Sequence, residues 1–392
     1  MRRSFPRIAV AGVALVHFLH DIYSALLAPV LPVLIRKHQL SYLQAGSLVV
    51  FLQGPSILNP FLGAILDRRR LGRTVLAVTP GLTAVAVCLA GLAPTYGALA
   101  VVLLAAGISV AALHVSAPVI VARMVGDEVG RGMGWFMLGG ELARTVGPLV
   151  AVWAVSALSL EGLWMLAPVG VAASVVLWRR LPRVRPDAPV RVSPSVVSTV
   201  RRMRRIFGAT LGIMVARSLL GGAVTTFLPT YMEGQGHSLW MAGASLSIYE
   251  IGGAVGALRG GALSDRIGRR PVLWGAIGLG PLAMLGLLYG PWLLLVPSLL
   301  VLGAGLIAIQ PTLLAAILEQ AGDDTAAANG IYMAMSFAIR ALVVLGVGAL
   351  ADGIGMRETF HVCAVGALLG VPFVFLIPLR SDGSVPGGPP RS

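Results

Sequence analysis

A charged motif occurs twice in this chain, about half a chain length apart. The stretch from Gly63 to Arg73 reads GAILDRRRLGR, and the stretch from Gly261 to Arg270 reads GALSDRIGRR. In both places a long apolar run with closely spaced Gly precedes the motif, and another apolar run follows it. The repeat predicts two similar halves embedded in a membrane, each with a short charged loop at the same place.

The composition is that of a membrane protein. Apolar residues make up 57% of the chain and charged residues 12%, against about 25% charged in a soluble domain. Apolar runs long enough to cross about 30 Å of hydrocarbon recur along the whole chain. Their approximate positions are 8–35, 42–66, 74–92, 96–122, 132–157, 162–178, 206–231, 240–262, 271–289, 292–318, 327–351 and 359–379. The expected fold class is an all-α membrane protein with twelve transmembrane helices in two six-helix pseudo-symmetric bundles.

The net charge of +14 is distributed unevenly over the predicted loops. One side carries Arg2, Arg3, Arg7, Arg68, Arg69, Arg70, Arg73, nine Arg from Arg179 to Arg205, Arg266, Arg269 and Arg270. The other side has only Arg36, Lys37 and Arg357. This bias predicts an inner (plasma) membrane protein with both termini in the cytoplasm. The basic loops have almost no aromatic or polar readout groups, which argues against nucleic acid as a partner.

The predicted organisation is an N-terminal six-helix bundle over 1–180, a basic cytoplasmic connecting loop over 181–205 and a C-terminal six-helix bundle over 206–380. A Gly- and Pro-rich tail over 381–392 is expected to be disordered. Gly252, Gly256 and Gly260 recur at helical spacing and predict a packing seam. Cys88 and Cys363 fall inside predicted helices and are expected to be core residues without a redox or metal role. We expect a monomer.

The doubled loop, the twelve spans and the long central connection resemble the major facilitator superfamily of secondary transporters, over the whole chain. A narrower resemblance is to its fosmidomycin-resistance-type branch of drug exporters. It rests on His17-Phe-Leu-His20-Asp21-Ile-Tyr23, Leu113-His114, the stretch from Gly139-Gly140 to Gly147-Pro148, Arg217-Ser218 and the stretch from Thr226 to Tyr231. The chain departs from that branch at Glu141, Arg144 and Arg340, which bears on the substrate and not on the fold.

The superfamily resemblance implies a conformational latch in the two loops. In that family the loop Asp pairs with basic groups and helix ends across the halves and closes the cytoplasmic side in one state only. Carried onto this sequence, the latch comprises Gly63, Asp67, Arg68, Gly72, Arg73, Asp265, Arg266, Gly268 and Arg269. The Arg residues also set the topology. Gly147-Pro148 resembles the Gly-Pro signature of exporters and predicts a hinge, because Pro removes a backbone donor.

Nine ionisable residues lie at membrane depth, where each charge costs about 2.5–3.5 kcal/mol. They are His17, His20, Asp21, His114, Glu141, Arg144, Arg217, Glu250 and Arg340. The family resemblance places all nine on helices that line or flank the central cavity. Three acids face three Arg, so a near-neutral cavity is predicted.

His17 and Asp21 are four residues apart and share one helix face. Burial in a low-dielectric cavity favours the protonated form of a carboxylic acid, so Asp21 is predicted to carry the transported proton. Glu141 and His17 are the residues expected to share in proton coupling. His20 is expected to be structural. His17, His20 and Asp21 with His114 also have spacing that suits a metal. Two His and one Asp on a single helix form a weak pattern, and no metal site is predicted.

Substrate binding is assigned to Arg144, Arg217, Arg340, Glu250, His114, Tyr23 and Tyr332. Arg stays charged, so these three Arg must face acids or an anionic ligand. One interpretation is a clamp around an anionic or zwitterionic substrate. The alternative pairs Arg144 with Glu141, and Arg217 or Arg340 with Glu250 and Asp21, which leaves the cavity suited to a neutral or lipophilic compound.

The sequence contains no catalytic constellation and no phosphate-binding loop with Lys and Ser or Thr. An enzyme and a cofactor are therefore not expected, and an ion gradient must drive transport. The predicted function is proton-coupled export of a small organic compound by alternating access, in contact with the lipid bilayer. Uptake of an organic anion, and a non-pumping sensor or lipid-handling protein of the same fold, are the alternatives.

Overall fold

The computed structural model describes residues 6–125, 128–181 and 196–377. Within these ranges the chain is helical and has no strand. Eleven of its helices are long and apolar enough to cross a membrane. The all-α prediction is confirmed. Most of the connection predicted over 181–205 and the whole tail predicted over 381–392 lie outside the described residues.

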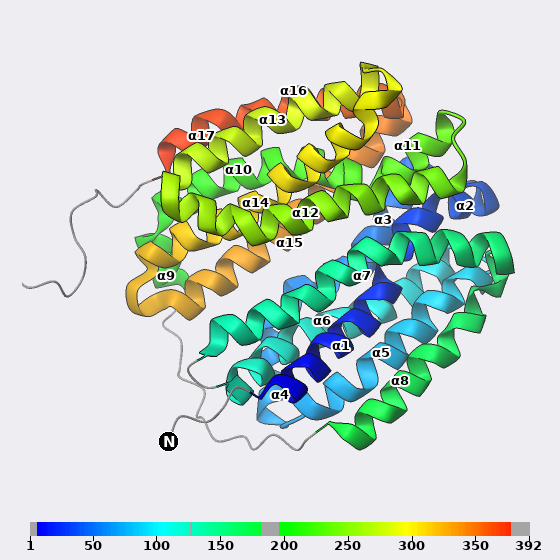
Figure 1. Ribbon diagram of the computed structural model, residues 1–392, viewed down its shortest axis with the longest axis horizontal. Helices are drawn as coiled ribbons and strands as arrows, with labels where there is room; N and C mark the ends of the chain where they lie inside the picture. The colour runs from blue at the N-terminus through cyan, green and yellow to red at the C-terminus, as the bar shows by residue number, and fades with distance from the viewer. Residues whose placement is uncertain (1–5, 126–127, 182–195, 378–392) are drawn as a thin grey trace, which may run out of the picture.

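The first half of the chain forms one group of helices (Figure 1). In chain order they are α1 (Arg7–Ser24), α2 (Leu27–His38), α3 (Tyr42–Gln53), η1 (Gly54–Leu58), α4 (Asn59–Arg68), α5 (Gly72–Leu89), η2 (Ala90–Leu92), α6 (Tyr96–Val125), α7 (Val129–Leu158), η4 (Glu161–Leu166) and α8 (Ala167–Arg180). The predicted span 42–66 is interrupted at η1, where the backbone tightens to a 3-10 helix. Pro55 at its start has no N–H to donate, so a continuous α-helix loses a hydrogen bond there.

The second half forms the other group (Figure 1). In chain order it comprises α9 (Val196–Arg202), α10 (Arg204–Gly222), η5 (Ala223–Phe227), α11 (Leu228–Gly234), α12 (Leu239–Ile267), α13 (Arg269–Tyr289), η6 (Trp292–Leu294), α14 (Leu295–Ala321), η7 (Gly322–Asp324), α15 (Thr325–Ile354), α16 (Met356–Ala367), η8 (Leu368–Gly370) and α17 (Val371–Leu376). Three of these helices end at a Gly with positive φ: α12 at Gly268 (95°), α14 at Gly322 (56°) and α15 at Gly355 (88°). Gly adopts this conformation without steric cost, so all three turns can be tight.

The Gly252, Gly256 and Gly260 seam predicted from the sequence is confirmed. These residues lie where α12 crosses α14, and a Cβ on Gly256 would stand 2.1 Å from the carbonyl oxygen of Ala304. Only Gly permits this approach, because the backbone of the partner helix occupies the place of the side chain.

We expect Gly256→Val to destabilise the protein by about 3 kcal/mol, because the added side chain must push α14 away from α12. Thermal unfolding of the purified protein in detergent measures the effect. Gly261→Val is the matched control, since nothing lies within 4 Å of a Cβ at Gly261. Equal stability of the two variants would show that α12 and α14 can separate at little cost.

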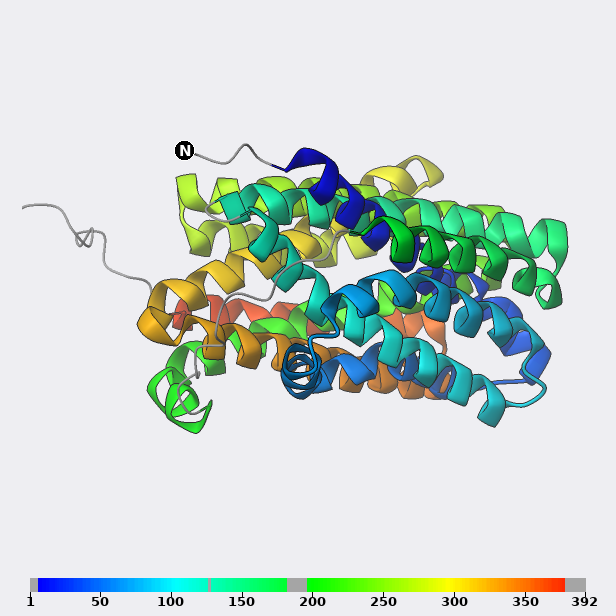
Figure 2. The same ribbon diagram turned by 90° about the horizontal axis from the view of Figure 1, so that it is seen from below.

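The two halves meet along α3 with α15 and along α7 with α12. Gly lies at these crossings as well. A Cβ on Gly348 of α15 would stand 2.6 Å from the carbonyl oxygen of Tyr42, and one on Gly243 of α12 would stand 2.5 Å from the side chain of Val152. Figure 1 shows the halves side by side, and Figures 1 and 2 both show the start of α1 and the end of α17 toward the same end of the bundle.

Polar contacts join the halves at one end of the bundle, where α2 turns into α3 and α11 turns toward α12. We call this end the opposite face, and the end with the two charged loops the Arg-rich face. At the opposite face Arg36 forms an ion pair with Glu233. The carboxylate of Asp352 accepts hydrogen bonds from the backbone N–H of Tyr42, at 2.6 Å, and of Leu43, at 2.9 Å. A carboxylate from one half thus caps the N-terminus of a helix in the other.

At the Arg-rich face, the polar contacts of Arg269 and Arg73 stay within one half. Arg269 bridges Asp265, at 2.6 Å, and Glu319, at 2.5 Å, all in the second half. Arg73 donates to the carbonyl oxygens of Leu181, at 3.0 Å, and Trp178, at 2.5 Å, both in the first half. The side chain of Asp67 is outside the described residues. The predicted latch across the halves is therefore not formed by Asp265, Arg269 or Arg73 in this state, and it stays a prediction for the other one.

Candidate functional site

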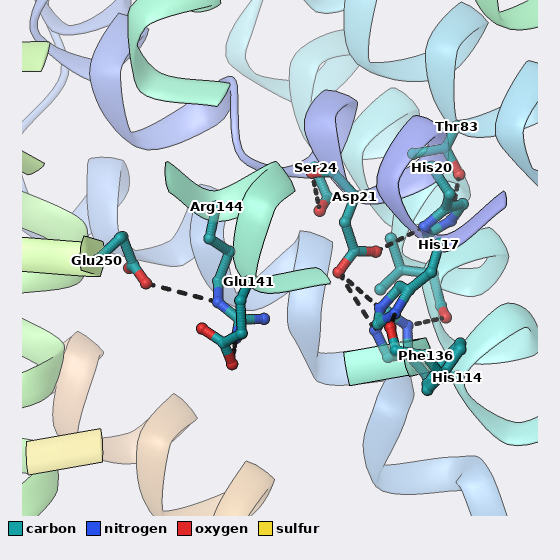
Figure 3. Close-up of polar contacts among 11 residues, drawn as sticks. His17, His20, Asp21, Ser24, Thr83, His114, Phe136, Glu141, Arg144 and Glu250 are labelled. Atoms are coloured by element: carbon teal, nitrogen blue, oxygen red, sulfur yellow. Dashed lines mark hydrogen bonds and ion pairs between the residues drawn. The ribbon is translucent and has the colours of Figure 1, made fainter. Parts of the chain in front are cut away.

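The first membrane span is interrupted between α1 and α2, just after a cluster of polar residues in α1. The backbone turns between α1 and α2 after Ser24, and the carbonyl oxygen of Asp21 accepts from the Ser24 hydroxyl and the Ala25 N–H, each at 2.9 Å. The Asp21 side chain points to His17 and to His114 of α6 (Figure 3). Its Oδ2 lies 3.1 Å from His17 Nε2 and 3.5 Å from His114 Nε2. Packing of α6 on α1 brings His114 to the pair predicted from the sequence.

Backbone carbonyl groups orient the two His rings. His17 Nδ1 lies 2.8 Å from the carbonyl oxygen of Phe136, and His114 Nδ1 lies 2.9 Å from that of Val110. A carbonyl only accepts, so both Nδ1 atoms carry hydrogen. The His17 ring is also stacked on the Phe136 ring at 4.0 Å. Gly140 makes room for it, since a Cβ there would stand 2.5 Å from the ring.

His20 contacts the other oxygen of the same carboxylate. Its Nδ1 lies 2.8 Å from Asp21 Oδ1, and its Nε2 lies 2.9 Å from Thr83 Oγ1 (Figure 3). Thr83 continues to Ser109 at 2.8 Å. His20 is completely buried. The sequence predicts a structural role for it, and its contacts with Asp21 and Thr83 would hold the Asp21 carboxylate in one orientation.

A second cluster joins the halves at membrane depth. Arg144 on α7 donates to Glu141 one turn earlier, and its Nε lies 3.5 Å from Glu250 Oε2 on α12 of the other half (Figure 3). Both carboxylates are buried. One oxygen of each, Glu141 Oε2 and Glu250 Oε2, has no hydrogen-bond partner among the described residues. Two carboxylates share one guanidinium, so the cluster carries one uncompensated negative charge when both are ionised.

The other two Arg lie in the second half without a carboxylate partner among the described residues. Arg217 donates to the carbonyl oxygen of Leu306, at 2.7 Å, and to Gln310, at 3.4 Å. Arg340 donates to Thr225 at 3.1 Å, and its Nε has no hydrogen-bond partner. Pairing of Arg217 or Arg340 with Glu250 and Asp21, the alternative from the sequence, does not occur in this state.

A hollow between the halves lies beside Arg340. It is small and partly open, with a cavity volume of about 10 Å³ in this state. On one side it is lined by α3 and η1, and on the other by α15. The lining residues are Val49, Val50, Gln53, Gly54, Phe337, Arg340, Ala341 and Val344. The Arg340 guanidinium is therefore a cationic group at an otherwise largely apolar wall.

Two of the residues predicted to bind substrate have other partners. The Tyr23 hydroxyl donates to the carbonyl oxygen of Leu166 in η4, at 2.9 Å, and so lies away from both clusters. The Tyr332 hydroxyl donates to the carbonyl oxygen of Gln310, at 3.0 Å, beside Arg217.

At the predicted hinge α7 stays helical through Pro148. A Cβ on Gly147 would stand 2.6 Å from that of Ala25, so Gly147 permits close packing of α7 on α1.

Several neutral residues near the ionisable groups were not singled out from the sequence: Phe136, Thr83, Ser109, Thr225 and Gln310. Ser and Thr are common inside membrane helices, and their spacing does not distinguish the residues that contact an ionisable group. Thr225 has the clearest structural context. It lies in η5, a π-helical turn between α10 and α11, and such turns are frequent at functional sites.

The sequence profile of the Major Facilitator Superfamily matches residues 13–344 and 261–391 of this chain. The chain belongs to the Major Facilitator Superfamily. It is a multi-pass membrane transporter and not an enzyme. It is 22% identical to the Fosmidomycin resistance protein of Escherichia coli (strain K12) over 381 residues, 94% of this chain and 92% of that protein. It is also 25% identical to the MFS-type transporter YfnC of Bacillus subtilis (strain 168) over 394 residues, 95% and 93% of the two chains.

Solved transporters have the same fold. A bacterial homolog of the lysosomal transporter Spinster, in an inward-facing and occupied conformation, superposes with a TM-score of 0.78 at 12% identity, covering 96% of this chain and 97% of that one. The nucleoside transporter NupG superposes with a TM-score of 0.76 at 17% identity, covering 95% and 100%. The fold prediction and the superfamily resemblance are confirmed.

Proposed function

We propose that this transporter exports a small anionic or zwitterionic organic compound in exchange for protons, by alternating access. The observation that carries the proposal is the Arg144 bridge, which links Glu141 of one half to Glu250 of the other. Such a bridge depends on how the halves are placed. A ligand or proton that alters it therefore changes the relative stability of the two states.

The negative charge of the substrate is supported by Arg217 and Arg340. Neither has an acid partner within the described part of the chain, whereas Arg144 has two. Unpaired cations at membrane depth are costly, so a bound anion that neutralises them gains the full interaction. Arg340 beside the hollow is the group we assign to direct contact, with Arg217 and Tyr332 behind it. Glu250 lies on the interface between the halves through its contact with Arg144. Substrate contact by His114 stays a prediction from the sequence, and Tyr23 is left out.

The coupling proton is assigned to Glu141. Its Oε1 is paired with Arg144, while Oε2 is buried and has no donor. A proton on Oε2 removes the excess negative charge that Glu141 shares with Glu250. Arg144 is then free to interact with Glu250 alone. Direct roles for Asp21 and His17 in proton coupling stay predictions from the sequence.

Export is favoured by similarity to the Fosmidomycin resistance protein, and fosmidomycin is the first probe. In proteoliposomes with an imposed pH difference, we expect accumulation of the probe on the acidic side. Counterflow without a gradient detects transport in either direction. A failure of counterflow with a panel of anions and zwitterions would contradict the carrier proposal. Movement of the probe with the proton, toward the alkaline side, would support uptake instead.

The Arg-rich face is proposed to be cytoplasmic and open in the state described above. The described polar contacts between the halves lie at the opposite face and, through Arg144 and Glu250, at membrane depth. Asp67→Asn is expected to shift the population further toward this state, because an amide cannot form the latch ion pair of the other state. The measurement is maleimide labelling of a Gln53→Cys reporter in the hollow, from the cytoplasmic side of membrane vesicles.

Asp352→Asn is the paired control for the latch. It weakens the cap on α3 that holds the opposite face together, so it should lower the labelling that Asp67→Asn raises. Labelling that moves in the same direction in both variants would mean that the charged loop does not select a state.

A further inference from the structure

We propose that His17, Asp21 and His114 bind one divalent transition-metal ion of the Zn²⁺ class. The three ligand atoms are His17 Nε2, His114 Nε2 and Asp21 Oδ2. They are separated by 3.4 Å between the two nitrogens, 3.1 Å from His17 to Asp21 and 3.5 Å from His114 to Asp21. Zn²⁺ held tetrahedrally at its usual bond lengths has ligand atoms about 3.3 Å apart. Three edges of a coordination tetrahedron are thus present before any ion is added.

The hydrogen-bonding state of the rings supports a cation at this point. Because both Nδ1 atoms donate to backbone carbonyl groups, a neutral His17 and a neutral His114 each direct a lone pair from Nε2. The two lone pairs point toward each other and toward Asp21 Oδ2. Three hydrogen-bond acceptors therefore converge with no donor between them. A metal ion satisfies all three at once.

The surrounding contacts are those that metal ligands require. Metal-binding imidazoles usually donate their second N–H to a carbonyl or carboxylate, which fixes the tautomer and the ring orientation. Phe136 and Val110 supply these carbonyl groups, and His20 holds the second oxygen of Asp21 at 2.8 Å. Two nitrogens with one oxygen favour Zn²⁺ and its neighbours over Ca²⁺ or Mg²⁺, which take oxygen ligands.

The site is buried on one side and reachable on the other. The side chains of His17 and Asp21 are 3% and 6% exposed, whereas that of His114 is 32% exposed. We assign the fourth coordination position to a water molecule on the His114 side. Since the ligands come from α1 and α6, a bound ion also ties these two helices together and stabilises the first half.

The proposal is tested on the full-length protein in detergent, after treatment with a chelator and without any gradient. Calorimetric titration with Zn²⁺ is expected to show one ion per chain. His114→Gln and Asp21→Asn should each weaken binding at least about 10-fold. His361→Gln is the matched control, because His361 bonds Tyr289 on the outer surface of the other half. Thermal unfolding without metal establishes that each variant is folded.

A gain of signal provides the second test. In His114→Cys, Co²⁺ should produce a thiolate-to-metal charge-transfer absorption that is missing from the wild-type protein and from His361→Cys. The native Cys88 and Cys363 are buried and remote in sequence from the ligands, so they serve as the internal background. The proposal is overturned if this band is absent and the wild-type protein binds no Zn²⁺. In that case a proton shared by the His17 and His114 rings would account for their close approach.

Zn²⁺ binding that is equally tight in His114→Gln and Asp21→Asn would also overturn it, because the ion would then lie elsewhere. Neither result depends on transport. If Zn²⁺ binds as expected but counterflow fails, the metal site stands and the proposed export falls. If counterflow succeeds and Zn²⁺ does not bind, the proposed transport stands and the metal site falls.

Discussion

Arg340→Gln is expected to weaken binding of the transported anion about 10- to 100-fold, the loss expected for one charge-assisted hydrogen bond of about 1.5–3 kcal/mol. Arg340 lies at the wall of the hollow and has an unpartnered Nε. Gln removes the charge and keeps a neutral amide donor at this position. Affinity is measured directly, for the best ligand from a thermal-shift screen that begins with fosmidomycin and includes neutral compounds.

The matched control is Arg259→Gln, which removes an Arg that is exposed on α12. Net charge changes equally in both variants, so a general electrostatic effect would appear in both. Unchanged affinity in Arg340→Gln would leave Arg340 as a structural partner of Thr225 and of the π-helical turn. A neutral compound as the best ligand would support the alternative in which the cavity suits lipophilic substrates.

Glu141→Gln should abolish accumulation of substrate against a gradient while counterflow exchange continues. Gln resembles the protonated acid, so the Arg144 bridge is fixed in the form proposed for the proton-loaded state. Transport by the wild-type protein should respond to the imposed pH difference, and transport by the variant should not. Both activities are measured in the same proteoliposomes, with Glu358→Gln, an exposed acid at the start of α16, as the control.

Asp21→Asn in the same assay separates the two assignments of the proton. If Glu141→Gln keeps full active transport and Asp21→Asn loses it, the original assignment from the sequence is correct and the one made from geometry is wrong. Loss in both would indicate that both carboxyl groups are needed for proton coupling.

The sequence by itself determined the membrane class, the duplication and the set of ionisable residues at membrane depth. These properties follow from composition and spacing, because about 30 Å of hydrocarbon must be crossed by apolar helices and a buried charge is costly. The Gly252, Gly256 and Gly260 seam was predictable for the same reason, since a small residue at every fourth position predicts close helix contact. The interruption at η1 was missed, although Gly54-Pro55 was a visible signal.

Only the tertiary structure decided which polar residues meet. His114 joins His17 and Asp21 from a helix almost a hundred positions later, and Glu250 reaches Arg144 across the boundary between the halves. Such pairs depend on the rotation and separation of neighbouring helices, which are set by close contacts such as those of Gly140 with His17 and Gly243 with Val152. A sequence specifies which residues share a face of one helix, but the facing helix is selected by packing of the whole bundle.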